Sequence, residues 1–208
     1  DIKRGDVPST ASAYADAHIG TVHIDHVVET PFAADAITVN PFLGSDSLQP
    51  FFETAKEHNK GIFILVKTSN PASGEFQDLI CGEKKLYEII AEKTHAWGKD
   101  FVGKKGYSAI GAVVGATFPH EISALRKIMP MAYFLVPGYG AQGAAAKDIE
   151  YCFNSDGLGA IINASRSILY AYNVSPWKEK YGICAWKEAT QKAVITMNEE
   201  IRKISKSY

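Results

Sequence analysis

The sequence predicts an α/β fold, in which parallel strands alternate with helices along the chain. Short apolar runs rich in β-branched residues alternate with longer segments of helical periodicity. These runs are continuously apolar, which is typical of strands that are buried on both faces of a parallel sheet. Polar residues, glycine or proline follow every run. The pattern favours a (β/α)8 barrel or a doubly wound sheet.

Each element is predicted from its own stretch of sequence. The predicted strands are residues 35–40, 61–67, 109–115, 132–136 and 159–163. The predicted helices are residues 9–28, 47–58, 83–97, 120–129 and 177–204, with a short helix near 144–153. Apolar spacing from Ile183 to Ile201 indicates that the last helix packs against the sheet.

The barrel is favoured because polar residues gather at the carboxyl ends of the predicted strands, which form the catalytic face of a barrel. About six strand ends are found, including one at Asp1, whereas a closed barrel needs eight and typically ~250 residues. We therefore predict that residues 1–208 form a single, N-terminally incomplete TIM-barrel domain. Its first two βα units and part of its third strand are expected upstream of residue 1.

The segment DIKRGD at residues 1–6 places two carboxylates around one ammonium at a predicted strand end. Side chains alternate along a strand, so Asp1 and Lys3 point the same way, and Gly5 lets the backbone turn before Asp6. Such an array is costly unless the charges satisfy one another or meet a charged ligand. We predict that Asp1, Lys3 and Asp6 are catalytic. A solvated strand end is the alternative reading of such a run.

Two later loops have the features of a phosphate site. Residues 137–143 carry three glycines that let backbone N–H groups approach a ligand, and Gln142 adds an uncharged donor. After the next predicted strand, Arg166 supplies a guanidinium that can bind phosphate through two hydrogen bonds. Loops after the last two strands are the usual phosphate site of a barrel. Ordinary surface positions are the alternative for Gln142 and Arg166.

Composition argues against several kinds of partner. A net charge of -1 and a pI near 6.7 give no general attraction to nucleic acid or to an anionic membrane, so a small molecule is expected. Three widely spaced cysteines without a Cys-x-x-Cys pair are typical of reduced cytoplasmic proteins. No apolar run approaches the ~20 residues that span a bilayer. His23 and His26 share a face of a predicted helix, but no further ligands cluster with them, so no metal site is expected.

Five motifs cover nearly the whole chain. They are DIKRGDVPST at 1–10, TVNPFLGSD at 38–46, VKTSNP at 66–71, VPGYGAQG at 136–143 and NASR at 163–166. In this order they resemble the orotidine 5'-monophosphate decarboxylase family, specifically its bacterial type 2 branch. The resemblance implies a cytoplasmic enzyme of pyrimidine synthesis that converts orotidine 5'-phosphate to uridine 5'-phosphate and CO2. It implies no metal and no organic cofactor.

The resemblance also implies roles for single residues. Lys3 would stabilise a carbanion at pyrimidine C6 and then protonate it, with Asp1 beside the substrate carboxylate. Asp6 would reach the active site of the neighbouring subunit in a homodimer, together with Val7 and Thr10, which contact the pyrimidine and the ribose.

Further implied contacts involve the later motifs. Ser69 would hydrogen-bond the pyrimidine amide edge, Pro137 would form part of the wall near the scissile carboxylate, and Gln142 and Arg166 would bind the phosphate. The chain departs from the family pattern at Val7, where isoleucine is common. The Asp and the Lys that the family draws from its first two strands also have no counterpart here.

Two other readings stay open. A related phosphosugar decarboxylase or aldolase-like synthase uses the same Asp-x-Lys-x-x-Asp run on the same fold with Mg2+, but it gives no reason for the loop at residues 69–71. A barrel that binds a phosphate ligand without catalysis is the other reading. CO2 release from orotidine 5'-phosphate in the presence of EDTA would distinguish these readings.

Overall fold

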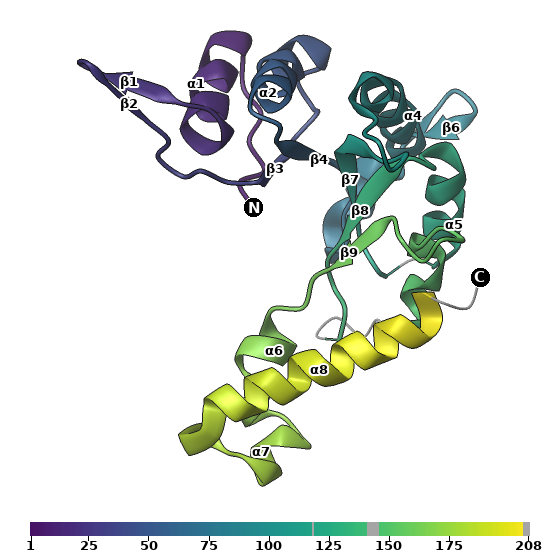
Figure 1. The fold of residues 1–208 in the computed structure, drawn as a ribbon. Coiled ribbons are helices and arrows are strands. Elements are labelled where there is room, and N and C mark those ends of the chain that lie inside the picture. Colours follow the sequence, from purple (N-terminus) through teal and green to yellow (C-terminus); the bar gives the residue numbers. More distant parts are fainter. Residues whose placement is uncertain (118, 141–145, 206–208) are drawn as a thin grey trace. The chain divides into compact units, whose positions relative to one another are not determined.

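The computed structural model describes residues 1–117, 119–140 and 146–205 of the 208-residue chain (Figure 1). The chain divides into two compact units, and each is described by itself. The first unit comprises residues 1–114 and 128–135, and the second comprises residues 115–127 and the described part of 136–208.

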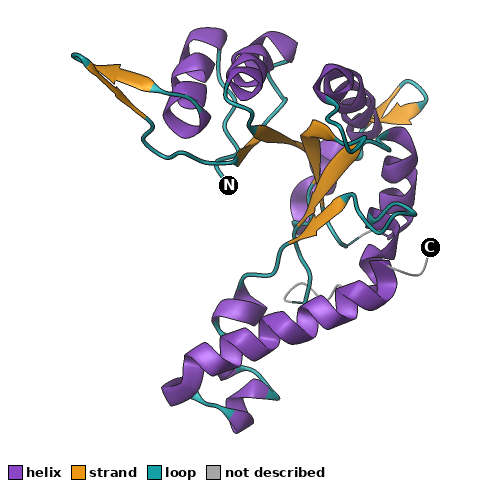
Figure 2. Cartoon of the chain, viewed as in Figure 1, coloured by secondary structure: helices purple, strands orange, loops and turns teal. Residues whose placement is uncertain are grey.

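Parallel strands form the centre of the first unit (Figure 2). Four strands pair side by side in chain order: β3 (Ala36–Val39), β4 (Gly61–Lys67), β7 (Ser108–Val114) and β8 (Ala132–Val136). Six of the seven residues of β7 are buried, as its continuous apolar character predicts for a strand covered on both faces. The predicted α/β class is therefore confirmed, and each of these strands lies within a residue or two of its predicted bounds.

The first residues of the chain run beside β3. Arg4 forms a parallel bridge with Val39, and the backbone N–H of Asn40 donates to the carbonyl oxygen of Arg4 at 2.7 Å. The chain therefore meets β3 through one isolated parallel bridge at Arg4. Residues 1–3 are not assigned to a strand, and Lys3 has a positive φ, so the extended conformation predicted for residues 1–3 is not continuous.

Helices connect the strands of the first unit, and several of them pack on the strands. They are α1 (Pro8–Ile19), α2 (Ser45–Glu57), η1 (Pro71–Ser73), α3 (Gly74–Gln77), α4 (Leu86–Gly98) and η2 (Lys99–Phe101). α1 lies against α2, and the two helices share one core with β3 and β4 (Figure 1). Ala15 and Ile19 of α1 and Phe51 of α2 are at most 1% exposed in this core. Burial of such side chains contributes roughly 1.5–3 kcal/mol for each large one.

Two antiparallel hairpins complete the first unit: β1 (Val22–Ile24) with β2 (Val27–Glu29), and β5 (Ile80–Cys81) with β6 (Lys84–Lys85). The first hairpin corrects the helix predicted over residues 9–28, which ends at Ile19. β-Branched residues from 22 to 28 favour strands, and Asp25 turns the chain with a φ of 54°. His23 and His26 therefore do not share a helix face.

Short helices surround one long helix in the second unit. The elements are α5 (Pro119–Ile128), η3 (Ala146–Cys152), β9 (Ala160–Ile162), α6 (Arg166–Leu169), η4 (Ala171–Asn173), α7 (Trp177–Lys180), η5 (Ile183–Ala185) and α8 (Trp186–Ser205). The expected helix near 144–153 is the 3-10 helix η3, while residues 144 and 145 lie outside the described residues.

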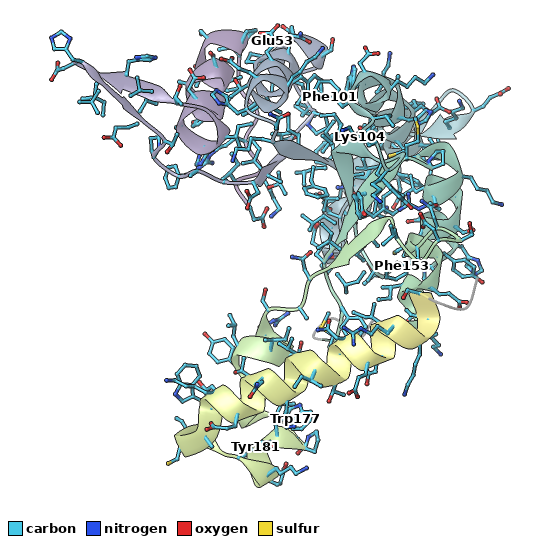
Figure 3. The ribbon with its side chains drawn as sticks, in the orientation of Figure 1. Glu53, Phe101, Lys104, Phe153, Trp177 and Tyr181 are labelled. Atoms are coloured by element: carbon cyan, nitrogen blue, oxygen red, sulfur yellow. The ribbon has the colours of Figure 1, made fainter. Side chains whose placement is uncertain are left out.

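α8 packs mainly on the short helices of its own unit. Ala189 and Ala193 of α8 are buried with Ala171, and Trp177 and Tyr181 of the α7 region pack against this cluster (Figure 3). The single helix predicted over residues 177–204 is therefore wrong, and its predicted packing on the sheet is replaced by these contacts. Gly182 separates the pieces with a φ of 59°, which interrupts helical geometry. None of the described helices is long and apolar enough to cross a membrane.

Candidate active site

An ion pair between Asp1 and Lys3 lies beside β3. Thr38, a β3 residue that is only 3% exposed, holds both partners. Its hydroxyl donates to Asp1 Oδ1 at 2.6 Å and accepts the backbone N–H of Lys3 at 3.0 Å. Both hydrogen-bonding functions of the hydroxyl are thus used, and a buried group fixes the geometry of a solvent-accessible charge pair. The structure therefore brings together two of the three residues predicted to be catalytic.

The backbone around this pair is constrained. Lys3 has a φ of 47°, a left-handed conformation that costs a non-glycine residue on the order of 1–3 kcal/mol and is concentrated at functional sites. At Gly5, an added Cβ would lie 2.6 Å from the carbonyl oxygen of Asn40. Gly5 is therefore required for the close approach of this segment to the end of β3, and not only for a turn.

Asp6 belongs to the entry of α1. Its Oδ1 accepts the backbone N–H of Val7 at 2.8 Å, and the carbonyl of Val7 accepts the N–H of Thr10 at 3.0 Å. Val7 precedes the first residue of α1, and its side chain is 52% exposed. Asp6, Val7 and Thr10 thus form one short segment at the start of α1.

Ser69 lies in the loop that follows β4, where Lys67 is the last strand residue. Lys67 is 1% exposed, and its Nζ lies 2.7 Å from Asp78 Oδ1 and 5.0 Å from the centre of the Tyr87 ring. The hydrogen bond from Lys67 lowers the pKa of the Asp78 carboxyl, and Lys85, 3.4 Å away, adds to the effect. No role was predicted for Lys67 from the sequence. The signal that could have indicated one is a lysine at the end of a buried apolar run.

Two loops of the second unit meet at a small cavity of about 180 Å3. Pro137 and Gly138 line it from the loop after β8, and Asn163 and Arg166 line it from the loop after β9. The N–H of Asn163 donates to the carbonyl of Val136 at 2.9 Å and so joins the roots of the two loops. Pro137 and Arg166 therefore lie at one cavity. Gln142 lies outside the described residues.

Tyr139 connects this glycine-containing loop to α8. Its hydroxyl donates to Glu200 Oε2 at 2.5 Å. Burial raises the pKa of the Tyr139 phenol, and the hydrogen bond to Glu200 raises it further. Gly138 and Gly140, on either side of Tyr139, have φ values of 101° and 72°, which side chains other than glycine rarely adopt. The loop is thus shaped by its glycines and held by a tyrosine that sequence reasoning did not single out.

Metal ligands form no obvious cluster here. In the part of the chain that the structure describes, no three His, Cys, Asp or Glu side chains are grouped so that they could hold a metal ion.

Comparison with known proteins places the chain in a family. The profile described as "Orotidine 5'-phosphate decarboxylase / HUMPS family" matches residues 1–180. The chain belongs to this family. The match covers both the Asp1–Lys3 pair and the loops around Pro137 and Arg166.

Individual relatives are similar over most of the chain. A protein of Caldicellulosiruptor bescii named orotidine 5'-phosphate decarboxylase is 48% identical over 172 residues, which are 83% of this chain and 56% of that protein. One of the same name from Rhodopirellula baltica is 43% identical over 97% of this chain and 66% of its own length. The chain thus spans between half and two thirds of these relatives.

A solved structure also resembles this one. The structure of Leishmania donovani OMP decarboxylase is 34% identical and has a TM-score of 0.70, covering 99% of this chain and 67% of that chain. The likeness supports assignment of the α/β fold to the TIM-barrel class. The number of units upstream of residue 1 and the type 2 branch stay predictions.

Proposed function

We propose that the protein is an orotidine 5'-phosphate decarboxylase, which breaks the bond between C6 of the pyrimidine and its carboxylate carbon. The observation that carries the proposal is the Asp1–Lys3 pair held by buried Thr38, in a chain 48% identical to a protein of that name. The family description also covers the HUMPS group, so the curated names favour the decarboxylase over the phosphosugar alternative. Localisation in the cytoplasm and a place in pyrimidine synthesis belong to the same proposal.

Lys3 has the central role in this mechanism. Loss of CO2 leaves an electron pair at C6, which the Lys3 ammonium stabilises and then protonates. One ammonium about 4 Å from a developing anion contributes ~4 kcal/mol at an effective dielectric of 20. Enzymes generally supply ~8–23 kcal/mol, so Lys3 is not sufficient alone. Asp1 and Thr38 hold the Lys3 segment in place, which removes the cost of ordering it during the reaction.

Binding of the phosphate supplies a further share. Arg166 and Pro137 line one cavity, and with Gln142 they form the proposed binding site for the phosphate and the adjoining wall. Binding energy from a remote phosphate can be used to close loops and exclude water at the reacting ring. Ser69, in the loop after β4, hydrogen-bonds the amide edge of the pyrimidine.

The active site is shared between two subunits of a homodimer in this proposal. Asp6, Val7 and Thr10 serve the neighbouring subunit's site. Val7 is exposed at the start of α1, so its side chain is accessible to a second chain, as this role requires. Phe42, which follows β3 and is 80% exposed, adds apolar surface to the same unit.

Mixing two inactive variants tests the shared site in the natural full-length protein. Lys3→Ala and Asp6→Ala should each be nearly inactive alone. After subunit exchange about half of the dimers are mixed, and each mixed dimer has one intact site, so roughly a quarter of all sites should recover. If activity stays at the sum of the two variants despite verified mixed dimers, Asp6 acts within its own subunit.

CO2 release from orotidine 5'-phosphate in the presence of EDTA tests the reaction itself. Undiminished release supports a metal-free decarboxylase. Activity that is lost with EDTA and returns with Mg2+ would favour the phosphosugar relative. Binding of nucleotide without any release of CO2 would favour the non-catalytic barrel.

A further inference from the structure

The loop after β4 is held by a two-point contact between Thr68 and Gln77. The backbone N–H of Thr68 donates to Gln77 Oε1 at 2.9 Å, and Gln77 Nε2 donates to Thr68 Oγ1 at 2.8 Å. Thr68 Oγ1 in turn donates to Asn70 Oδ1 at 2.7 Å. The three side chains therefore form one chain of hydrogen bonds that runs from α3 to both neighbours of Ser69.

The chemistry of this contact selects glutamine at position 77. A side-chain amide has a carbonyl that accepts the peptide N–H and an amino group that donates to the hydroxyl. Glutamate would keep the acceptor and lose the donor, and leucine would lose both. The pattern also fixes the direction of the Thr68 hydroxyl, which donates its proton to Asn70 Oδ1 because an amide oxygen can only accept.

The base of the loop is closed next to this contact. Lys67 precedes Thr68 and Asp78 follows Gln77, and their side chains are 2.7 Å apart. Because Lys67 is buried, this ion pair holds the two ends of the loop close together. Consecutive pairs, Lys67 with Asp78 and Thr68 with Gln77, thus hold the loop.

Ser69 lies between Thr68 and Asn70, the two residues that these hydrogen bonds hold; the contacts of Gln77, Thr68 and Asn70 are called the brace below. It is partly exposed, and within the described part of the chain its hydroxyl has no hydrogen-bonding partner. Because both neighbours of Ser69 are held by hydrogen bonds, the backbone at Ser69 is ordered and its hydroxyl is available to a ligand. Pre-organised groups of this kind bind a ligand at a lower entropic cost.

We propose that Gln77 is a positioning residue that sets recognition of the pyrimidine base by acting through Ser69. The inference rests on the proposed function, because that function assigns Ser69 to the amide edge of the base. It goes beyond it, because the role assigned to Gln77 is to fix the loop through Thr68, without contact to the base. Loss of the brace should therefore weaken contacts to the base and leave contacts to the ribose phosphate unchanged.

The test compares two ligands in the natural full-length protein by calorimetry: uridine 5'-phosphate, which has the base, and ribose 5-phosphate, which lacks it. Gln77→Leu should raise the Kd for uridine 5'-phosphate about tenfold, which corresponds to ~1.4 kcal/mol. The Kd for ribose 5-phosphate should stay within about twofold, in line with a contact that this ligand does not make. Gln77→Glu, which keeps the acceptor, should lie between the wild type and Gln77→Leu. Glu75→Gln, an exposed change in the same short helix, is the matched control and should bind both ligands as the wild type does.

A double-mutant cycle tests whether the effect passes through Ser69. In a Ser69→Ala background, Gln77→Leu should raise the Kd for uridine 5'-phosphate by less than about threefold, because the group it positions is already absent. Multiplicative effects would overturn the proposal, as would equal losses on both ligands. A thermal unfolding scan of each variant checks that it is folded. If Gln77→Leu is unfolded, the comparison of the two ligands is made with Gln77→Glu instead. Failure of the wild type to bind uridine 5'-phosphate would overturn the proposed function as well, whereas normal binding with no selective effect would overturn this inference alone.

Discussion

Thr38 donates to the Asp1 carboxylate at 2.6 Å across 37 positions of sequence. The same hydroxyl accepts the backbone N–H of Lys3, so one buried β3 residue sets both the carboxylate and the backbone of the proposed catalytic lysine. The strained φ of Lys3 is held by these contacts. The charge pair is thus held in place by a residue of the strand beside it.

Replacement of Thr38 by valine should remove both hydrogen bonds while keeping the shape of the side chain. The part-buried backbone N–H of Lys3 then loses its partner, and each hydrogen bond removed costs about 0.5–1.5 kcal/mol of unfolding free energy. We also expect kcat for decarboxylation to fall, because Asp1 and Lys3 lose their common support. Thr38→Ser keeps the hydroxyl and is the control. Urea unfolding and steady-state kinetics measure the two effects, and a wild-type kcat in Thr38→Val would contradict the positioning role.

Replacement of Gly5 by alanine should destabilise the first unit by about 1–3 kcal/mol, because the new Cβ meets a backbone oxygen that cannot rotate away. The Arg4 bridge to β3 must shift to relieve the clash. Gly103→Ala is the control, since a Cβ added there would lie 3.7 Å from the Tyr107 carbonyl oxygen, at ordinary van der Waals distance. Equal urea midpoints for the two variants would show that the close approach at Asn40 is not a constraint.

Removal of the Asp78 charge should change stability in a pH-dependent way. The pKa of folded Asp78 is lowered, so its contribution is complete above the unfolded pKa of about 3.9 and is lost as the pH falls through the folded pKa. Asp78→Asn should therefore be less stable than the wild type by about 1–2 kcal/mol at pH 7, the lower part of the range for a hydrogen bond to a charged group, because water screens a side chain that is about one third exposed. The difference should shrink below pH 4. Chemical unfolding at several pH values measures it, with exposed Asp100→Asn as the control. A gap that stays constant down to pH 2 would rule out the ionised pair as the cause.

Arg166→Ala should lower kcat/KM for the nucleotide far more than for the phosphate-free nucleoside orotidine. Hydrogen bonds to a charged group contribute roughly 1.5–3 kcal/mol, which is on the order of 10- to 100-fold. The nucleoside has no phosphate to lose, so its kcat/KM should change little. Lys192→Ala removes an exposed cation from α8 and should have no such effect. Equal losses on both substrates would argue against phosphate binding at Arg166.

The strands could be predicted from the sequence because their burial on both faces leaves a continuous apolar run, as in β4 and β7. The hairpin β1–β2 could not, since its apolar residues are spaced in a way that also fits a helix. The break at Gly182 was missed for a related reason: apolar periodicity extends across it, and only the positive φ shows that the helix is interrupted.

The site could be predicted where the chemistry lies in one short segment, as with Asp1 and Lys3. Thr38 and Gln77 were missed because their roles come from contacts that the fold creates. Thr38 meets residues 35 and 37 positions away, and a buried threonine in a strand looks like ordinary core. Gln77 lies in a polar stretch, where glutamine has no distinctive pattern until its partner at Thr68 is known.

Release of CO2 by Lys3→Ala tests the central claim most directly. The natural full-length protein and this variant are compared in single turnovers with orotidine 5'-phosphate, and the Kd for uridine 5'-phosphate is measured for both. Loss of ~4 kcal/mol of carbanion stabilisation, together with the proton donor, should slow CO2 release by at least about a thousandfold. The Kd should change by no more than about tenfold, and exposed Lys56→Ala should behave as the wild type. CO2 release by Lys3→Ala at close to the wild-type rate would contradict the assignment of Lys3 and the mechanism built on it.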